Sequence, residues 1–130
     1  MFVLELNRRA GERGVDLVSA AAHPGYAATG LQRVGPRMSG SELKERLTDL
    51  ENRIFAQSAA NGALPGLYAA TAPGVRGGQY FGPDRLFGMR GNPTPVPFVR
   101  AARDPDTARR LWEISEQLTD VRFDALGPRG

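Results

Sequence analysis

The first residues of the chain carry apolar side chains at helical spacing. This spacing predicts a helix over residues 1–13, and Gly14 behind it is a residue that can end a helix in the left-handed conformation. The apolar pattern is already running at the second residue, without a capping side chain before it. The positions on the apolar face are Phe2, Val3, Leu6 and Ala10.

A short and almost continuously apolar run, residues 15–22, follows this helix. Strands that are covered on both faces, as in parallel sheets, have this character, whereas half-exposed strands alternate. The run ends at His23-Pro24-Gly25, because proline cannot continue a hydrogen-bond ladder and glycine permits a sharp turn. A helix, a buried strand and a glycine turn in succession predict an α/β fold.

Two further helices are predicted in the middle of the chain. Ser39 and Glu42 have the spacing of a capping box, and the apolar residues behind them predict a helix over residues 42–54. A second helix is predicted over residues 59–71, with Pro65 either in its first turn or at a kink. The apolar positions of the first of these helices are Leu43, Leu47, Leu50 and Ile54.

The last third of the chain is expected to hold one strand and one helix. Residues 79–81 stand between glycines and predict a very short strand beside residues 15–22 and parallel to it, while residues 92–98 predict an extended loop. Asp104 and Pro105 have the order of an N-cap and a first helical residue, which predicts a helix over residues 105–118. Its expected buried face consists of Ala108, Leu111, Trp112, Ser115 and Leu118.

The composition narrows the chemistry that is open to this chain of 130 residues, a length that fits one domain or part of one. The absence of cysteine excludes disulfides and thiolate sites, and the single histidine, His23, excludes a zinc cluster and a histidine-based triad. The net charge is only +3 and the arginines are dispersed among acidic residues, so we expect no nucleic-acid partner. Without a secretory signal or a strongly apolar span, a cytoplasmic protein is predicted.

The most specific signal follows the predicted strand. Residues 24–29, Pro-Gly-Tyr-Ala-Ala-Thr, resemble the P-G-x-x-x-T element after the sixth strand of short-chain dehydrogenases/reductases. Residues 2–6 resemble the end of that family's catalytic helix, 61–73 the helix before its last strand, and 77–83 that strand. The combination is most similar to the retinol-dehydrogenase and protochlorophyllide-reductase-like branch. It implies that residues 1–130 are the C-terminal part of one Rossmann-like domain, with the last two strands of a doubly wound parallel sheet and their flanking helices, incomplete on its own.

The resemblance also implies a cofactor, NAD or NADP, and a small carbonyl or alcohol substrate. In the family, the loop after P-G faces the nicotinamide end of the cofactor, which a threonine hydroxyl and backbone groups hold. Carried over by position, this assigns cofactor contact to Gly25, Tyr26, Ala27 and Thr29. The other interpretation is a plain strand-to-loop turn with Thr29 as a cap. Residues 31–55 correspond to the substrate lid, and His23 is interpreted as a packing residue.

The chain departs from the family at the catalytic residues. Family members use a tyrosine general acid whose pKa is lowered by a lysine four places further on. Here the tyrosines are followed at that place by Gly30, Ala72 and Asp84. The glycine-rich phosphate loop is also absent, so no catalytic residue is assigned and the chain alone is expected to be inactive. By resemblance, Met1 falls shortly after the expected lysine.

Three hypotheses therefore remain open at the level of the sequence. The first is a fragment of an oxidoreductase that transfers hydride between NAD(P) and a carbonyl or alcohol. The second is a non-catalytic α/β binding or interaction module, and the third is a small ligand-binding α/β domain unrelated to the family. In the fragment hypothesis, residues 15–22 form an apolar strand without most of its neighbours, and such an edge is prone to self-association.

Overall fold

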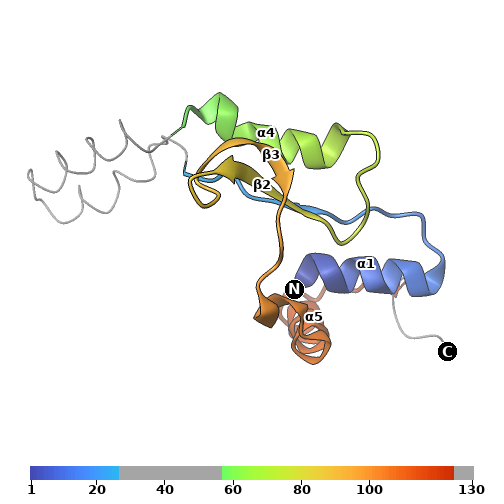
Figure 1. Ribbon diagram of the computed structural model, residues 1–130. Helices are drawn as coiled ribbons and strands as arrows, with labels where there is room; N and C mark the ends of the chain where they lie inside the picture. Colours follow the sequence, from blue (N-terminus) through green and yellow to red (C-terminus); the bar gives the residue numbers. More distant parts are fainter. Residues whose placement is uncertain (27–56, 125–130) are drawn as a thin grey trace, which may run out of the picture. The chain divides into compact units, whose positions relative to one another are not determined.

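A computed structural model of the chain describes residues 1–26 and 57–124 (Figure 1). The helix predicted over residues 42–54 and the lid predicted over residues 31–55 lie outside the described residues. The described helices and strands are α1 (Phe2–Arg13), β1 (Ala21–Ala22), α4 (Ala59–Thr71), β2 (Tyr80–Arg85), β3 (Arg90–Pro95), the 3₁₀ helix η2 (Arg100–Arg103) and α5 (Pro105–Thr119).

The strands form a three-stranded mixed sheet in the order β1-β2-β3. The N–H of Ala21 donates to the carbonyl of Gln79 at 2.9 Å, and the N–H of His23 donates to Phe81 at 2.9 Å. Because donors and acceptors advance in the same direction along both segments, β1 and β2 are parallel, which confirms the predicted pairing. β3 runs antiparallel to β2, with Gly82 opposite Thr94.

Two predictions about the strands are wrong. Residues 92–98 were expected as a loop, but β3 occupies 90–95, because proline is tolerated in a strand at the edge of a sheet. The strand expected over 15–22 is limited to Ala21–Ala22. Ahead of it, the N–H of Gly78 donates to the carbonyl of Ser19 at 2.8 Å, but no regular strand continues there. The apolar residues before β1 are exposed rather than covered: Val15 by 38%, Leu17 by 38% and Val18 by 59%.

The chain divides into two compact units, and the division falls within β1 and β2. The first unit consists of Met1–Ala21, Ala72–Tyr80 and Val96–Gly130, and it contains α1 and α5. The second consists of Ala22–Thr71 and Phe81–Pro95, and it contains α4 and the β2–β3 hairpin. Each unit has its own packing, described below.

In the first unit, α1 and α5 pack against each other around Ala10 and Trp112, each 1% exposed. The ring of Phe2 stacks on Trp112 with centroids 4.7 Å apart, and the guanidinium of Arg9 lies 4.8 Å from the centroid of the same indole. The buried face of α5 is narrower than predicted, because Leu111 and Leu118 are exposed. The buried residues of α5 are Ala108 and Trp112.

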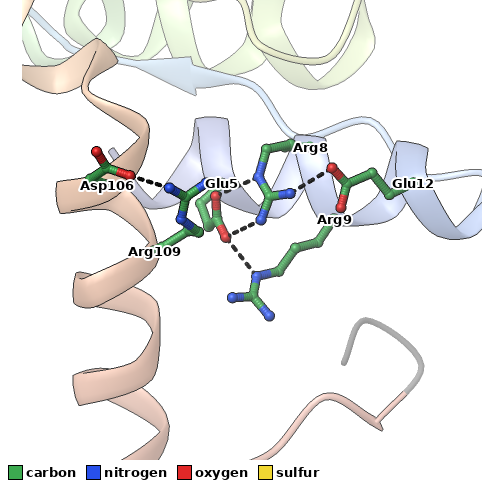
Figure 2. A network of polar contacts seen from close by, with 6 residues as sticks. All are labelled: Glu5, Arg8, Arg9, Glu12, Asp106 and Arg109. Carbon is green, nitrogen blue, oxygen red and sulfur yellow. Dashed lines mark hydrogen bonds and ion pairs between the residues drawn. The ribbon is translucent and has the colours of Figure 1, made fainter. Parts of the chain in front are cut away.

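A buried carboxylate anchors two arginines of α1 (Figure 2). Glu5, with its side chain 1% exposed, accepts from Arg8 at 2.6 and 2.8 Å and from Arg9 at 2.7 Å. Arg8 also reaches Glu12 at 2.6 Å. The hydrogen bond from Arg8 is the main cause that lowers the pKa of Glu5; burial opposes this effect and Arg9 adds to it. Glu5 therefore stays ionised inside the unit, which holds Arg9 over the indole of α5.

The ends of the helices follow the capping signals. Gly14 ends α1 with φ 66°, as predicted. Asp104 caps α5 by accepting from the N–H of Asp106 at 3.3 Å and from the hydroxyl of Thr107, and the latter bond lowers the pKa of Asp104. Pro65 lies inside α4 beyond its first turn, in the middle of the helix.

In the second unit, α4 packs against β3 and runs along the β2–β3 hairpin (Figure 1). The ring of Tyr68 from α4 lies 5.2 Å from that of Phe81 on β2, and Phe81 is only 1% exposed. Pro83 is also fully buried. This unit carries the loop that the sequence singles out.

Candidate functional site

The candidate site is the loop of residues 23–26, which leaves β1 at its carboxyl end. In open α/β sheets, ligands bind beyond the carboxyl ends of parallel strands, so the loop stands where a cofactor contact is expected. The N–H of His23 still belongs to the ladder with Phe81, and the chain turns away immediately behind it. Gly25 makes the turn with φ +68°, in the left-handed region that glycine enters without cost.

The loop closes on the turn of the β2–β3 hairpin. The N–H of Tyr26 donates to the carbonyl of Met89 at 2.7 Å. A Cβ atom at Gly25 would lie 2.4 Å from that same carbonyl oxygen and 2.8 Å from Cγ of Pro83. Two separate features therefore require glycine at position 25: its positive φ and the close approach of the hairpin.

The hairpin turn that receives the loop has an unusual backbone. Leu86, Phe87 and Gly88 are consecutive residues with positive φ, at 48°, 56° and 81°. Non-glycine residues rarely adopt this conformation, and the side chain of Phe87 is fully exposed at the tip. In this turn the N–H of Met89 donates to the carbonyl of Leu86 at 3.1 Å, and the carbonyl of Met89 accepts from Tyr26.

His23 packs inside the loop. Its Nδ1 accepts from the N–H of Gly25 at 3.2 Å, and its ring lies directly over Gly82 of β2 and close to Gly88. An acceptor role at Nδ1 places the proton of a neutral imidazole on Nε2. This geometry agrees with the interpretation of His23 as a packing residue.

Gln57 is the residue that sequence reasoning missed. It is 3% exposed, its N–H donates to the carbonyl of Tyr26 at 2.9 Å, and its Nε2 donates to the carbonyl of Pro24 at 2.6 Å. Its Oε1 accepts from the N–H of Gly91 on β3 at 3.2 Å. A single glutamine ahead of a helix forms no motif, so the sequence holds no signal that separates it from a surface residue.

Four backbone groups of the described part of the loop are hydrogen-bonded within the protein. The N–H groups of Gly25 and Tyr26 donate to His23 and Met89, and the carbonyls of Pro24 and Tyr26 accept from Gln57. Of the four residues assigned to cofactor contact, Gly25 and Tyr26 therefore lie together on a fixed backbone. Ala27 and Thr29 lie outside the described residues.

Residues 1–26 and 57–124 contain no group of three or more His, Asp or Glu side chains that could hold a metal ion. Within the same ranges, no helix combines the length and apolar character needed to cross a membrane.

No family model matches the chain. It is 32% identical over 124 residues to the short chain dehydrogenase/reductase dpmpH of Macrophomina phaseolina. The matched stretch covers 89% of this chain and 52% of that protein. It is 30% identical over 123 residues to human retinol dehydrogenase 14. Here the matched stretch covers 93% of this chain and 32% of that protein. The chain thus spans from about a third to about half of the length of these curated relatives.

A solved structure of an uncharacterised protein from Mycobacterium paratuberculosis is also similar. It is 34% identical, superposes with a TM-score of 0.63, and covers 94% of this chain and 35% of that protein. The α/β fold with its mixed sheet accordingly matches part of a larger Rossmann-like fold.

Proposed function

Because this chain is a homologue of short-chain dehydrogenases/reductases over most of its length, we propose that it forms the nicotinamide-side part of an NAD(P)-dependent oxidoreductase. In this proposal, residues 1–130 are the C-terminal part of a single domain, and the reaction moves a hydride between the cofactor and a carbonyl or alcohol substrate.

One observation carries the proposal: the Pro-Gly loop leaves the carboxyl end of a strand that pairs in parallel with β2 and is fixed against the adjoining hairpin. A plain surface turn needs no such fixation. The donors of Gly25 and Tyr26 are already used inside the protein, so these two residues would contact the cofactor through the Tyr26 side chain and the bare glycine surface. Backbone donors and the Thr29 hydroxyl, further along the loop, would hold the carboxamide.

The cofactor, when bound, supplies or accepts the hydride, and the described residues hold its nicotinamide end. The sequence contains no tyrosine followed four places on by lysine, so we place the proton-transferring pair outside these 130 residues. The chain likewise has no glycine-rich helix start for a pyrophosphate. Cytoplasmic localisation stays a prediction from the sequence.

The proposal is tested by titrating the ¹⁵N-labelled chain with pieces of the cofactor. Nicotinamide mononucleotide and NADP⁺ are expected to shift the amide signals of Gly25, Tyr26, Ala27 and Thr29 at similar, high concentrations, because the adenosine half finds no contacts. Adenosine 2′-monophosphate is expected to shift none of them. In parallel, NADPH absorbance should remain constant when the chain is mixed with a panel of aldehydes and ketones.

Two results would contradict the proposal in different ways. Reduction of a carbonyl by the chain alone would show that the fragment hypothesis is wrong. Absence of shifts with nicotinamide mononucleotide would favour the plain turn and, with it, the non-catalytic module.

A further inference from the structure

The geometry points to Gln57 as a positioning residue that sets the backbone of loop 24–26 against the hairpin. The consequence for cofactor binding rests on the proposed function, whereas the positioning itself does not. Gln57 precedes α4, so it reaches the loop from a segment more than thirty residues further along the chain.

Three hydrogen bonds of Gln57 converge on the loop and the hairpin. Two of them hold the carbonyls on either side of Gly25: the backbone N–H binds Tyr26 at 2.9 Å and Nε2 binds Pro24 at 2.6 Å. The third, from the N–H of Gly91 to Oε1 at 3.2 Å, fixes the same side chain to β3. The side-chain amide therefore joins two backbone segments that otherwise meet through the bond between Tyr26 and Met89.

The orientation of this amide is set by its partners. A carbonyl such as that of Pro24 can only accept and the N–H of Gly91 can only donate, so Nε2 must face the loop and Oε1 the hairpin. At 3% exposure, water has little access to replace either bond. A rotated or lost amide would leave a buried donor and a buried acceptor unpaired, which folded proteins avoid.

Substitutions can remove the two side-chain bonds of Gln57, to Pro24 and to Gly91, separately or together. Gln57→Glu keeps an oxygen that accepts from Gly91 but puts a second oxygen against the carbonyl of Pro24, where a donor is needed. Gln57→Met keeps the approximate shape and removes both bonds. Gln79→Glu is the matched control, because the Oε1 of Gln79 accepts from the N–H of Arg76 at 2.7 Å and a carboxylate can do the same.

The test is amide hydrogen exchange, measured by NMR on the full chain and its variants without cofactor. Gln57→Glu removes the hydrogen bond to the carbonyl of Pro24, so the loop should detach more readily from the hairpin. The N–H of Tyr26, which binds Met89, should then exchange about tenfold faster, as expected for a loop held by one hydrogen bond fewer. The N–H of Gly91 should keep its protection. In Gln57→Met both should exchange faster. The amides of Ala21 and His23, which belong to the β1–β2 ladder, should be unchanged in every variant, and Gln79→Glu should behave as the unsubstituted chain.

Unchanged protection of Tyr26 in both Gln57 variants would overturn the inference. An equal loss at Tyr26, Ala21 and His23, or failure of both variants to fold, would also overturn it, because Gln57 would then serve general stability. A second titration with nicotinamide mononucleotide links the result to function: Gln57→Glu should bind about tenfold more weakly and Gln79→Glu equally well. If the unsubstituted chain does not bind the mononucleotide, the proposed function fails while the exchange result still decides the role of Gln57.

Discussion

The imidazole of His23 occupies the space where a side chain at position 82 would begin. A Cβ atom at Gly82 would lie 2.0 Å from Nε2 and 2.6 Å from Cδ2 of the ring. His23 follows β1 and Gly82 lies in β2. Because Gly82 has no side chain, the ring of His23 can lie directly against the backbone of β2. In that position its Nδ1 accepts from Gly25 and supports the candidate loop.

Gly82→Ala is expected to destabilise the second unit by about 1–3 kcal/mol, the usual cost of overfilling a packed site. Urea unfolding followed by circular dichroism measures the change. Gly66→Ala is the control, because nothing lies within 4 Å of a Cβ at that helical position, and it should be neutral or stabilising by up to about 1 kcal/mol.

The histidine itself should account for the cost at position 82. In a double-mutant cycle, His23→Ala should remove most of the penalty of Gly82→Ala, because the overlapping ring is gone. Additive effects would show that the strain arises elsewhere.

Gly25→Ala and Gly14→Ala compare a left-handed glycine with and without a close neighbour. Both residues have nearly the same φ, +68° and +66°, but a Cβ at Gly14 meets nothing within 4 Å and one at Gly25 meets the Met89 carbonyl at 2.4 Å. Gly14→Ala should cost about 1 kcal/mol for backbone strain alone. Gly25→Ala should cost at least about 1 kcal/mol more. Equal losses in urea unfolding would contradict the close approach of loop and hairpin.

Glu5 should give the first unit a pH-dependent contribution. Its pKa is lowered below the ordinary value of 4.5, chiefly by the hydrogen bond from Arg8, so its stabilising effect is complete above that value and is lost as the pH falls through the lowered pKa. Glu5→Gln should therefore cost about 1–3 kcal/mol at neutral pH, and the difference from the unsubstituted chain should shrink below about pH 4.

Unfolding free energies at several pH values measure this dependence. Glu12→Gln provides the comparison, because Glu12 also binds Arg8 but its side chain is 60% exposed, so it should have a much smaller effect. A difference between Glu5→Gln and the unsubstituted chain that stays constant down to acid pH would contradict the lowered pKa.

Self-association is expected through the exposed apolar residues before β1. Val18 is 59% exposed beside a strand that, in the described sheet, has a neighbour on one side. Val18→Glu should reduce association in sedimentation velocity, whereas Val99→Glu should not, although Val99 is 72% exposed. A chain that stays monomeric at all concentrations would contradict this expectation.

The sequence predicted elements whose signals are local. Helix α5 begins where Asp104 and Pro105 indicate, and α1 ends where Gly14 indicates, because a cap acts within its own turn. The extent of β1 and the exposure of Leu118 could not be predicted, since burial depends on what packs against a segment and not on the segment itself. β3 was missed because its prolines disfavour a strand everywhere except at an edge.

In the candidate site, too, residues with a local signal could be predicted and residues placed by the tertiary fold could not. Gly25 could be singled out because a Pro-Gly turn has a recognisable pattern. Gln57 could not, because its role comes from three partners brought together by the fold, and none of them is near it in the sequence.

The parallel pairing of β1 with β2 joins residues that are far apart in the sequence, which bears on the order of folding. The β2–β3 hairpin joins residues that are close in the sequence, whereas Ala21 meets Gln79 only after the long intervening segment has been closed into a loop. Closing a long loop costs entropy before any contact repays it. We therefore expect the β2–β3 hairpin to form before β1, with the turn behind it, pairs with β2.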